Sequence, residues 1–308
     1  MRQRHGLETH PDSLAGMKIG IFGKGGSGKS TILVLLAQAL ARRGHRVTVL
    51  DADSTNQGLS QALDIHELPQ SLMDYFGGAV FQGGSVTCPV DDPTPLAGAT
   101  LRLRDLPPAY RARSPLGIRY LVAGKIGNQG PGAGCDGPVA KIARDLRLPA
   151  ELTLVDFKAG FEDSARGVVT GIDWGLVVVD PSTASLRIAA DMQSLFDALI
   201  RHVPPATRHL EAEGAALMRD LFRHADIRGL SFVLNRIDNP ETEAYLRSAL
   251  EEESIEALAS VPADPAVARA WLRGSPLHAA KKDSEVFVRL AQALEELVPG
   301  RAQPLAVD

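Results

Sequence analysis

The chain has 308 residues, of which 44% are hydrophobic and 23% are charged, so it can bury one sizeable core and suits one large α/β domain. This composition is neither that of a disordered chain nor that of a membrane protein. The formal net charge of −4 argues against nucleic acid as the main partner.

The N-terminal extension, residues 1–16, is polar and has no apolar centre, so we expect a flexible tail and neither a signal peptide nor a membrane anchor. The two cysteines, Cys88 and Cys135, lie far apart and form no C-x-x-C pair. This predicts a reducing compartment, with the cytoplasm as the default. We expect one folded domain over residues 17–299 and a C-terminal tail over residues 300–308.

A glycine-rich loop over residues 23–31 follows a predicted strand, residues 17–22, and precedes an apolar segment with helical spacing. Strand, glycine loop and helix are the context of a phosphate-binding loop, in which backbone N–H groups and the helix N-terminus bind phosphate. Lys29 adds a full positive charge, Ser30 can ligate Mg²⁺, and Thr31 can bond an inner phosphate. The predicted nucleotide-binding residues of the loop are Gly25, Gly26, Ser27, Gly28, Lys29, Ser30 and Thr31.

The loop carries a second lysine, Lys24, which an ordinary phosphate loop does not need because Lys29 already reaches the outer phosphates. The string KGGSGKST, residues 24–31, resembles the deviant Walker A loop of the MinD/ParA-type ATPases. That class includes the nitrogenase iron protein and accessory ATPases that load metal into enzymes. The resemblance implies that Lys24 crosses a dimer interface to the partner's ATP, and therefore that the ATP-bound form is a homodimer.

Two aspartates, Asp51 and Asp53, leave a strand predicted over residues 46–50, which follows a helix predicted over residues 32–43. Ligands of open parallel sheets collect at the carboxyl ends of strands, so the pair suits Mg²⁺-bound water and an attacking water, with the glycine loop on the adjacent strand. The alternative is that both residues only cap a helix that begins near Gln57. The spacing leaves open which aspartate orients the water. The pair also resembles the D-x-D switch I of the same ATPases.

Residues 67–115 are the least regular part of the chain and are rich in proline and glycine. Loops of this length are usually functional or mobile, so we interpret the segment as a family-specific insertion that contacts a partner protein. Residues 101–104 alternate between leucine and arginine, which predicts one short strand within it.

A dense glycine loop, residues 127–137, holds Cys135 and lies between a strand predicted over residues 117–124 and a helix predicted over residues 138–147. A cysteine in such a loop is sterically open and can bind metal; the alternative is a small residue without that role. The loop resembles the metal-binding loops of the nitrogenase iron protein and of CooC-like ATPases, although CooC-like proteins have a C-x-C pair here. A symmetric dimer would supply two copies of Cys135 to an interface transition-metal site, which needs further ligands.

An apolar strand predicted over residues 151–156 ends in Asp156, and Gly160 follows four residues later. Beside a phosphate loop, a strand-terminal aspartate reaches Mg²⁺ through water, and such a glycine offers its N–H group to the γ-phosphate. This is the Walker B and switch II layout. Lys158 stands where that family is expected to have an acidic or neutral residue. We therefore expect the coupling between nucleotide and effector to differ in this chain.

Asn235, in an apolar strand predicted over residues 230–237, can present a donor and an acceptor to an adenine edge; the alternative is a turn-forming asparagine. The strand end resembles the N-[KR] base-recognition motif of the family. Residues 261–264 resemble its I-P-x-D loop, which implies that Pro262 and Asp264 lie against the adenine. The remaining predictions are a strand over residues 172–181 and helices over residues 182–202, 210–222, 266–272 and 284–297.

We therefore predict a doubly wound α/β fold, with a mostly parallel sheet and helices on both faces, that binds MgATP across a twofold dimer. Hydrolysis would use Lys24 and Lys29 as charge stabilisers, and Asp51 or Asp53 to orient water. The predicted Mg²⁺ ligands, partly through water, are Ser30, Asp53 and Asp156.

Cys135 and the resemblance around switch II favour a CooC-like ATPase for metal insertion or metalloenzyme maturation, with a client metalloenzyme or assembly protein as partner. A MinD/ParA-type positioning ATPase is the second hypothesis; its membrane-targeting members carry a basic amphipathic C-terminal helix, whereas residues 283–296 are mainly acidic. An iron-protein-like electron donor is the third hypothesis, because this chain lacks the second pair of cysteines that a four-cysteine cluster between two subunits needs. A non-enzymatic nucleotide-binding regulator is the fourth. We find no clear nucleic-acid or membrane signal.

Overall fold

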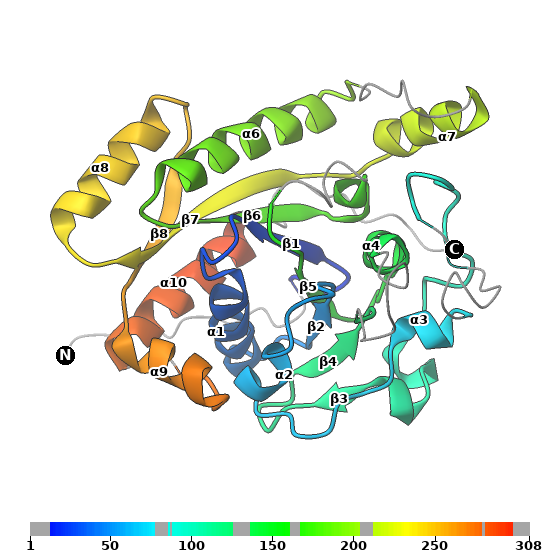
Figure 1. Cartoon of the computed structure of the whole chain (residues 1–308), viewed down its shortest axis with the longest axis horizontal. Helices are drawn as coiled ribbons and strands as arrows, with labels where there is room; N and C mark the ends of the chain where they lie inside the picture. Colours follow the sequence, from blue (N-terminus) through cyan, green and yellow to red (C-terminus); the bar gives the residue numbers. More distant parts are fainter. Residues whose placement is uncertain are drawn as a thin grey trace, which may run out of the picture.

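A sheet of eight strands forms the middle layer of the computed structural model, which describes residues 13–77, 86, 88–125, 136–160, 167–203, 212–278 and 281–297 (Figure 1). The strand order is β3-β4-β2-β5-β1-β6-β7-β8. β3 runs antiparallel to β4, and the other neighbours run parallel. The predicted fold class is therefore confirmed. The strands are β1 (Lys18–Gly23), β2 (Val47–Asp51), β3 (Ala112–Arg113), β4 (Arg119–Val122), β5 (Leu152–Asp156), β6 (Trp174–Val179), β7 (Gly229–Ile237) and β8 (Ala257–Pro262).

Helices cover both faces of the sheet, which explains why β1, β2, β5 and β6 are buried at every residue. Helices α1 (Lys29–Arg42) and α10 (Lys281–Leu297) share one apolar core with the sheet; α4 (Gly137–Asp145), α6 (Thr183–Ile200) and α8 (Pro240–Glu251) share the other (Figure 1). The remaining helices are α2 (Leu59–Ala62), α3 (Leu72–Tyr75), α7 (Ala212–Arg223), α9 (Pro265–Arg273), and the 3₁₀ turns η2 (Leu103–Asp105), η3 (Pro108–Tyr110) and η4 (Val168–Gly171).

Strand β5 lies between β1 and β2, so the prediction that β2 is adjacent to the strand of the glycine loop is wrong. Parallel strands are joined by crossovers that need not connect neighbours, and the chain order alone does not show this insertion. The register pairs Asp156 with Ile21 on one side and with Asp51 on the other. Asp156 therefore ends the strand next to the glycine loop, and Asp51 ends the strand beyond it.

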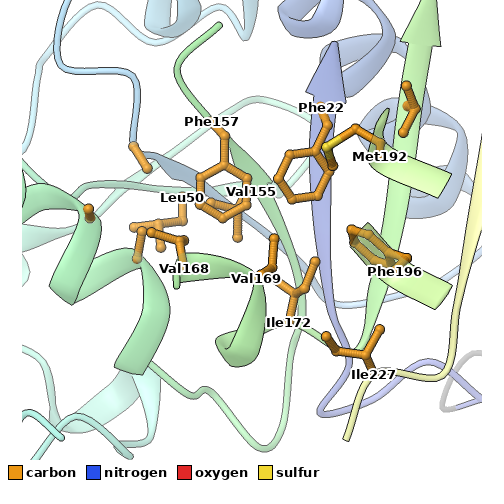
Figure 2. Close-up of a cluster of buried hydrophobic side chains, with 14 of the residues drawn as sticks. Phe22, Leu50, Val155, Phe157, Val168, Val169, Ile172, Met192, Phe196 and Ile227 are labelled. Carbon is orange, nitrogen blue, oxygen red and sulfur yellow. The ribbon is translucent and has the colours of Figure 1, made fainter. Parts of the chain in front are cut away.

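Aromatic rings fill the core between the sheet and α6 (Figure 2). Phe22 stacks on Phe157 with ring centroids 5.0 Å apart and meets Phe196 edge-on at 6.0 Å. Gly20 leaves room for the stack, because a Cβ atom there would lie 2.8 Å from both the Phe22 and Phe157 rings. Phe22 directly precedes the glycine loop and Phe157 directly follows Asp156, so the stack holds these two strand ends together.

Most predicted helices and strands are present, with their ends shifted by a few residues. The strand predicted over residues 101–104 is wrong, because Leu103–Asp105 forms the turn η2. Leu103 is buried and Arg104 is exposed, an alternation that a tight turn produces as well as a strand does. The nearest sheet-like contact is an isolated bridge between Thr100 and Arg147.

Candidate functional site

The glycine loop joins β1 to α1 in a conformation that two of its glycines make possible. Gly23 has a φ angle of 140°, and a Cβ atom there would lie 2.5 Å from a backbone carbonyl oxygen of β6. Gly28 has a φ angle of 95°, and a Cβ atom there would lie 2.1 Å from Nδ2 of Asn235. Both positions therefore require glycine. Lys29 is buried, and its Nζ donates hydrogen bonds to the backbone oxygens of Gly23 and Lys24 at 3.3 Å each.

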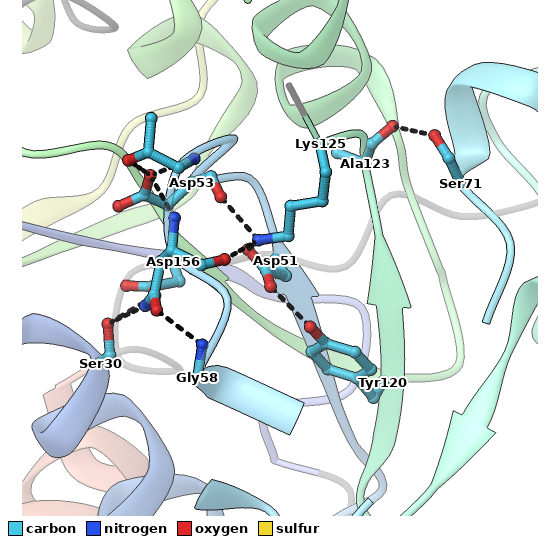
Figure 3. A network of polar contacts seen from close by, with 11 residues as sticks. Ser30, Asp51, Asp53, Gly58, Ser71, Tyr120, Ala123, Lys125 and Asp156 are labelled. Carbon is cyan, nitrogen blue, oxygen red and sulfur yellow. Dashed lines mark hydrogen bonds and ion pairs between the residues drawn. The ribbon is translucent and has the colours of Figure 1, made fainter. Parts of the chain in front are cut away.

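The Ser30 hydroxyl at the start of α1 lies beside the Asp156 carboxylate at the end of β5. The Ser30 hydroxyl donates a hydrogen bond to Oδ2 of Asp156 at 2.7 Å and accepts one from Nδ2 of Asn56 at 2.9 Å (Figure 3). Oδ1 of Asp156 is buried and has no hydrogen-bond partner within the described residues. Burial, and then the neighbouring Asp51 carboxylate, raises the pKa of Asp156 to about 7. An added cation would relieve this cost, and hydroxyl and carboxylate oxygens are the ligands that Mg²⁺ prefers, so the pair fits a magnesium site.

Asp51 is fully buried and both of its carboxylate oxygens are engaged. Oδ2 accepts a hydrogen bond from the Tyr120 hydroxyl at 2.6 Å, and Oδ1 accepts one from Nζ of Lys125 at 2.7 Å (Figure 3). Burial raises the pKa of Asp51, while the ion pair with Lys125 acts in the opposite direction. Burial also raises the pKa of Tyr120, so its hydroxyl remains a donor. These contacts suit a structural role for Asp51 better than the orientation of a water molecule.

Asp53 is half-buried and lines a cavity of about 290 Å³ over the glycine loop, together with Lys29. Its Oδ1 accepts hydrogen bonds from the N–H and hydroxyl of Thr55, at 2.9 and 2.7 Å, and from the N–H of Asn56 at 3.2 Å. Lys125 holds this turn from behind, because its Nζ donates to the backbone oxygens of Asp53, at 2.7 Å, and Asn56. Asp53 thus caps a local turn, and α2 begins farther on, after Gly58.

Lys24, the predicted intersubunit lysine, contacts its own chain in this structure. Its Nζ lies 3.0 Å from Oδ2 of Asp180 and donates a hydrogen bond to the Ser182 hydroxyl at 3.1 Å. Both partners stand where β6 leads into α6. Burial alone would raise the pKa of Asp180, but hydrogen bonds from Ser182 and Lys24 outweigh it and hold this pKa below its ordinary value.

A second cavity, of about 320 Å³, lies between the ends of β7 and β8 and helix α9. Asn235, Pro262 and Asp264 line it, together with apolar side chains from α1, α9 and α10. An apolar cavity with a few polar groups suits a planar base. Nδ2 of Asn235 donates to the backbone oxygen of Ser27 at 2.7 Å, and Oδ1 of Asp264 caps α9 by accepting from the N–H of Ala266 at 2.7 Å. The adenine contacts of these residues therefore stay predictions.

Two further predicted phosphate ligands are already hydrogen-bonded within the chain. The N–H of Gly160 donates to the backbone oxygen of Gly23 at 3.2 Å, so it must be released before it can reach a γ-phosphate. The Thr31 hydroxyl accepts a hydrogen bond from Nε1 of Trp271 at 2.8 Å. The phosphate contacts predicted for Gly160 and Thr31 thus depend on whether each of these hydrogen bonds breaks or is kept when nucleotide binds.

Cys135 lies outside the described residues, and the described residue that follows it, Asp136, is ion-paired. Oδ2 of Asp136 lies 3.0 Å from Nζ of Lys158, two residues beyond the strand-terminal aspartate of β5. Cys88 packs against the first turn of α4, because a Cβ atom at Gly137 would lie 2.9 Å from its Sγ.

Within the described ranges, no group of three or more His, Cys, Asp or Glu side chains could hold a metal ion. No helix in the same ranges is long and apolar enough to cross a membrane.

Four residues of this site were missed by reasoning from the sequence: Tyr120, Lys125, Asp180 and Trp271. Lys125 directly follows the strand predicted over residues 117–124, and Asp180 lies near the end of the strand predicted over residues 172–181, so both could have been placed at the same edge of the sheet as the aspartates. Tyr120 lies within a strand and Trp271 within a helix, and neither position carries a signal that separates it from an ordinary core residue.

The sequence matches the model of one protein family over most of its length. The CobQ/CobB/MinD/ParA nucleotide binding domain matches residues 21–277. An uncharacterized ATP-binding protein of Methanocaldococcus jannaschii is 28% identical over 269 residues, which cover 85% of this chain and 94% of the relative. The carbon monoxide dehydrogenase accessory protein CooC of Rhodospirillum rubrum is 30% identical over 194 residues, which cover 58% of this chain and 68% of CooC.

The same architecture occurs in solved structures. The septum site-determining protein MinD from Pyrococcus horikoshii OT3, in complex with Mg-ADP, is similar to this structure with a TM-score of 0.60 at 19% sequence identity. The similarity covers 94% of this chain and 99% of the MinD chain. At this level of identity the similarity shows a shared fold.

Proposed function

Because the chain belongs to the CobQ/CobB/MinD/ParA family of nucleotide-binding domains, we propose that it hydrolyses ATP with Mg²⁺ as a homodimer and drives metal insertion or maturation of a metalloenzyme. The observation that carries the ATPase proposal is the convergence of Lys29, Ser30, Asp53 and Asp156 at the carboxyl ends of β1, β2 and β5. Cation, hydroxyl and carboxylates at one sheet edge are the groups that phosphoryl transfer uses.

The geometry supports a division of roles among these side chains. Ser30 and Asp156 would hold Mg²⁺, which when bound neutralises phosphate charge and orients the terminal phosphates. Lys29 would contact the outer phosphates. Asp53, which faces the cavity over the glycine loop, would orient the attacking water, while Asp51 holds Lys125 behind it. This assigns different tasks to two aspartates that the sequence did not distinguish.

The dimer proposal rests on Lys24, whose charge the chain's own nucleotide does not need. In the ATP-bound dimer each Lys24 would leave Asp180 and make charge-assisted hydrogen bonds to the partner's phosphates. Hydrolysis removes that contact and favours release. The ion pair within one chain is therefore interpreted as the resting position of this lysine.

The metal proposal rests on Cys135 and on the relationship to CooC. CooC is by name an accessory protein of carbon monoxide dehydrogenase, and its matched region covers 58% of this chain. We propose that Cys135 binds a transition metal at the dimer interface, with a metalloenzyme or its assembly protein as client. The described residue next to it, Asp136, is ion-paired with Lys158 close to the proposed Mg²⁺ ligand Asp156.

Phosphate release from ATP tests the catalytic proposal. We expect turnover that requires Mg²⁺, and a loss of about 100-fold or more in Asp53→Asn, with ADP affinity unchanged because Asp53 would act only on the water. Asp226→Asn is the matched control, since Asp226 precedes β7 at the opposite edge of the sheet and is exposed. Full turnover by folded Asp53→Asn would contradict this assignment, and no turnover by the wild type would refute the ATPase proposal.

Metal analysis of anaerobically purified protein tests the biological proposal. We expect metal bound by the wild type with ATP and lost in Cys135→Ala. If the protein binds no cysteine-dependent metal in any nucleotide state, the proposed role in metal insertion is refuted. ATP-dependent recruitment to liposomes or to DNA would instead favour a positioning ATPase. Of the described apolar side chains of α10, Phe287 and Leu290 are buried against the core, whereas Leu297 in the last turn is 41% exposed.

A further inference from the structure

Trp271 connects three parts of the nucleotide site although it stands on a helix with no buried residue. Helix α9 begins at the Asp264 cap and ends at Gly274, which has a φ angle of 60°. From its last turn the half-buried indole reaches α1, where its Nε1 donates a hydrogen bond to the Thr31 hydroxyl at 2.8 Å. Figure 1 shows the corresponding proximity of α9 to α1 and α2. The contact joins residues that are 240 positions apart in the chain.

The indole also lies at the junction of the two cavities. Thr31, Arg236 and Trp271 line both the base cavity of about 320 Å³ and the phosphate cavity of about 290 Å³. A nucleotide whose base and outer phosphates occupy these cavities must therefore pass its sugar and inner phosphate along these three residues. Trp271 is thus part of the wall against which that junction would lie.

The hydrogen bond to Thr31 determines what the Thr31 hydroxyl can offer a ligand. An indole N–H group is a donor only, whereas a hydroxyl has one proton and can also accept. Because the Trp271 N–H group occupies one lone pair of the Thr31 oxygen, the hydroxyl proton points away from the indole. No acceptor for this proton is recorded within the described residues. An inner phosphate oxygen, which only accepts, is the complementary ligand for it.

The ring of Trp271 also supports the loop that carries Asp53. A Cβ atom at Gly58 would lie 2.8 Å from Cζ3 of the indole, so the two are in close contact. The N–H of Gly58 donates to Oδ1 of Asn56 at 3.0 Å, and Nδ2 of Asn56 donates to the Ser30 hydroxyl at 2.9 Å. Trp271 therefore contacts both the first turn of α1 and the turn that follows Asp53.

We propose that Trp271 is a positioning residue for the inner phosphate of a bound nucleoside di- or triphosphate. Its indole N–H orients the Thr31 hydroxyl toward that phosphate, and its ring closes the wall between the base and phosphate cavities. This inference rests on the proposed function, because it requires a nucleotide at the glycine loop. Since ADP and ATP share the inner phosphates, the effect of Trp271 is the same for both, unlike that of a γ-phosphate ligand.

The test is the Trp271→Phe variant, which keeps an aromatic ring and removes the N–H donor. Dissociation constants for ADP and for a non-hydrolysable ATP analogue are measured by calorimetry in wild type, Trp271→Phe, Thr31→Val and the double variant. We expect Trp271→Phe to weaken both nucleotides by about five-fold, as for the loss of one ordinary hydrogen bond. In the Thr31→Val background, Trp271→Phe should have no further effect.

Leu272→Ala is the matched control, because Leu272 is the next residue of α9 and is 86% exposed; it should bind both nucleotides as the wild type does. Three results would each overturn the inference. Trp271→Phe could weaken nucleotide binding equally with and without the Thr31 hydroxyl, it could weaken binding of the ATP analogue alone, or it could leave both affinities unchanged. Wild-type protein that binds no nucleotide would instead refute the proposed function, so the two failures are distinguishable.

Discussion

If the ATP-bound form is the proposed homodimer, the ion pair between Lys24 and Asp180 must break in each subunit before the dimer can form. Lys24 cannot contact a partner's nucleotide while its Nζ lies 3.0 Å from Oδ2 of Asp180. Asp180→Asn removes the charge and keeps the shape and the acceptor oxygen for the Ser182 hydroxyl, which donates to Oδ1 at 2.7 Å. We therefore expect Asp180→Asn to favour the ATP-bound dimer.

The size of the effect follows from the exposure of the pair and from the symmetry of the dimer. The Lys24 side chain is 29% exposed and that of Asp180 is 11% exposed, so the pair is solvated on one side and should contribute about 1 kcal/mol. Two subunits each release one lysine, which makes about 2 kcal/mol per dimer. This corresponds to a dimer dissociation constant that is lower by about 30-fold.

Sedimentation equilibrium with a non-hydrolysable ATP analogue measures that constant directly. The control is the double variant Lys24→Ala/Asp180→Asn, which should show no tightening because the released group is missing. Lys24→Ala alone should weaken the dimer, and ADP should support no dimer of any variant. An unchanged or higher dissociation constant for Asp180→Asn, with an unchanged thermal unfolding midpoint, would refute the reasoning.

Two further predictions concern stability and are read by urea denaturation. Glu295 on α10 accepts hydrogen bonds from Arg43 and His45 at 2.7 Å each, so Glu295→Gln should lower the free energy of unfolding by about 1 to 3 kcal/mol at pH 7. Burial opposes ionisation, but the partners hold the pKa of Glu295 below its ordinary value. The difference from wild type should therefore be full above the ordinary glutamate pKa of about 4.3 and shrink as the pH falls from there through the lowered pKa of Glu295. A difference independent of pH would contradict this. Gly20→Ala places a methyl group 2.8 Å from the Phe22 and Phe157 rings and should cost about 1 to 3 kcal/mol; an unchanged urea midpoint would show that the stack moves aside without cost.

The parts of the site that the sequence predicted are those that one local pattern specifies. The glycine loop is one, because Gly23 and Gly28 adopt positive φ angles and tolerate no Cβ atom, and glycine spacing is visible along the chain. Strand-terminal aspartates are another, since an apolar run followed by a carboxylate places Asp156 at the ligand edge of a parallel sheet. Local chemistry of this kind needs no knowledge of which strands are neighbours.

The parts that were missed depend on contacts between distant positions. Lys24 and Ser182 are 158 residues apart, and Thr31 and Trp271 are 240 residues apart. The pairing of β2 with β4 places Asp51 beside Tyr120 of β4 and Lys125 just after it. Spacing therefore could not separate the role of Asp51 from that of Asp53, whereas the hydrogen bonds of the folded chain do.

Both described residues that border segment 126–135, Lys125 and Asp136, are tied to the proposed nucleotide site. Lys125 is bonded to Asp51 and to the backbone of the turn at Asp53, and Asp136 is ion-paired with Lys158. A nucleotide that moved the Asp53 turn would therefore act on Lys125, and one that moved the residues after β5 would act on Asp136. Lys158, which departs from the expected family pattern, supplies one of these two links. If Cys135 binds metal as proposed, we expect the ion pairs of the two flanking residues, Lys125 with Asp51 and Asp136 with Lys158, to link its state to the nucleotide.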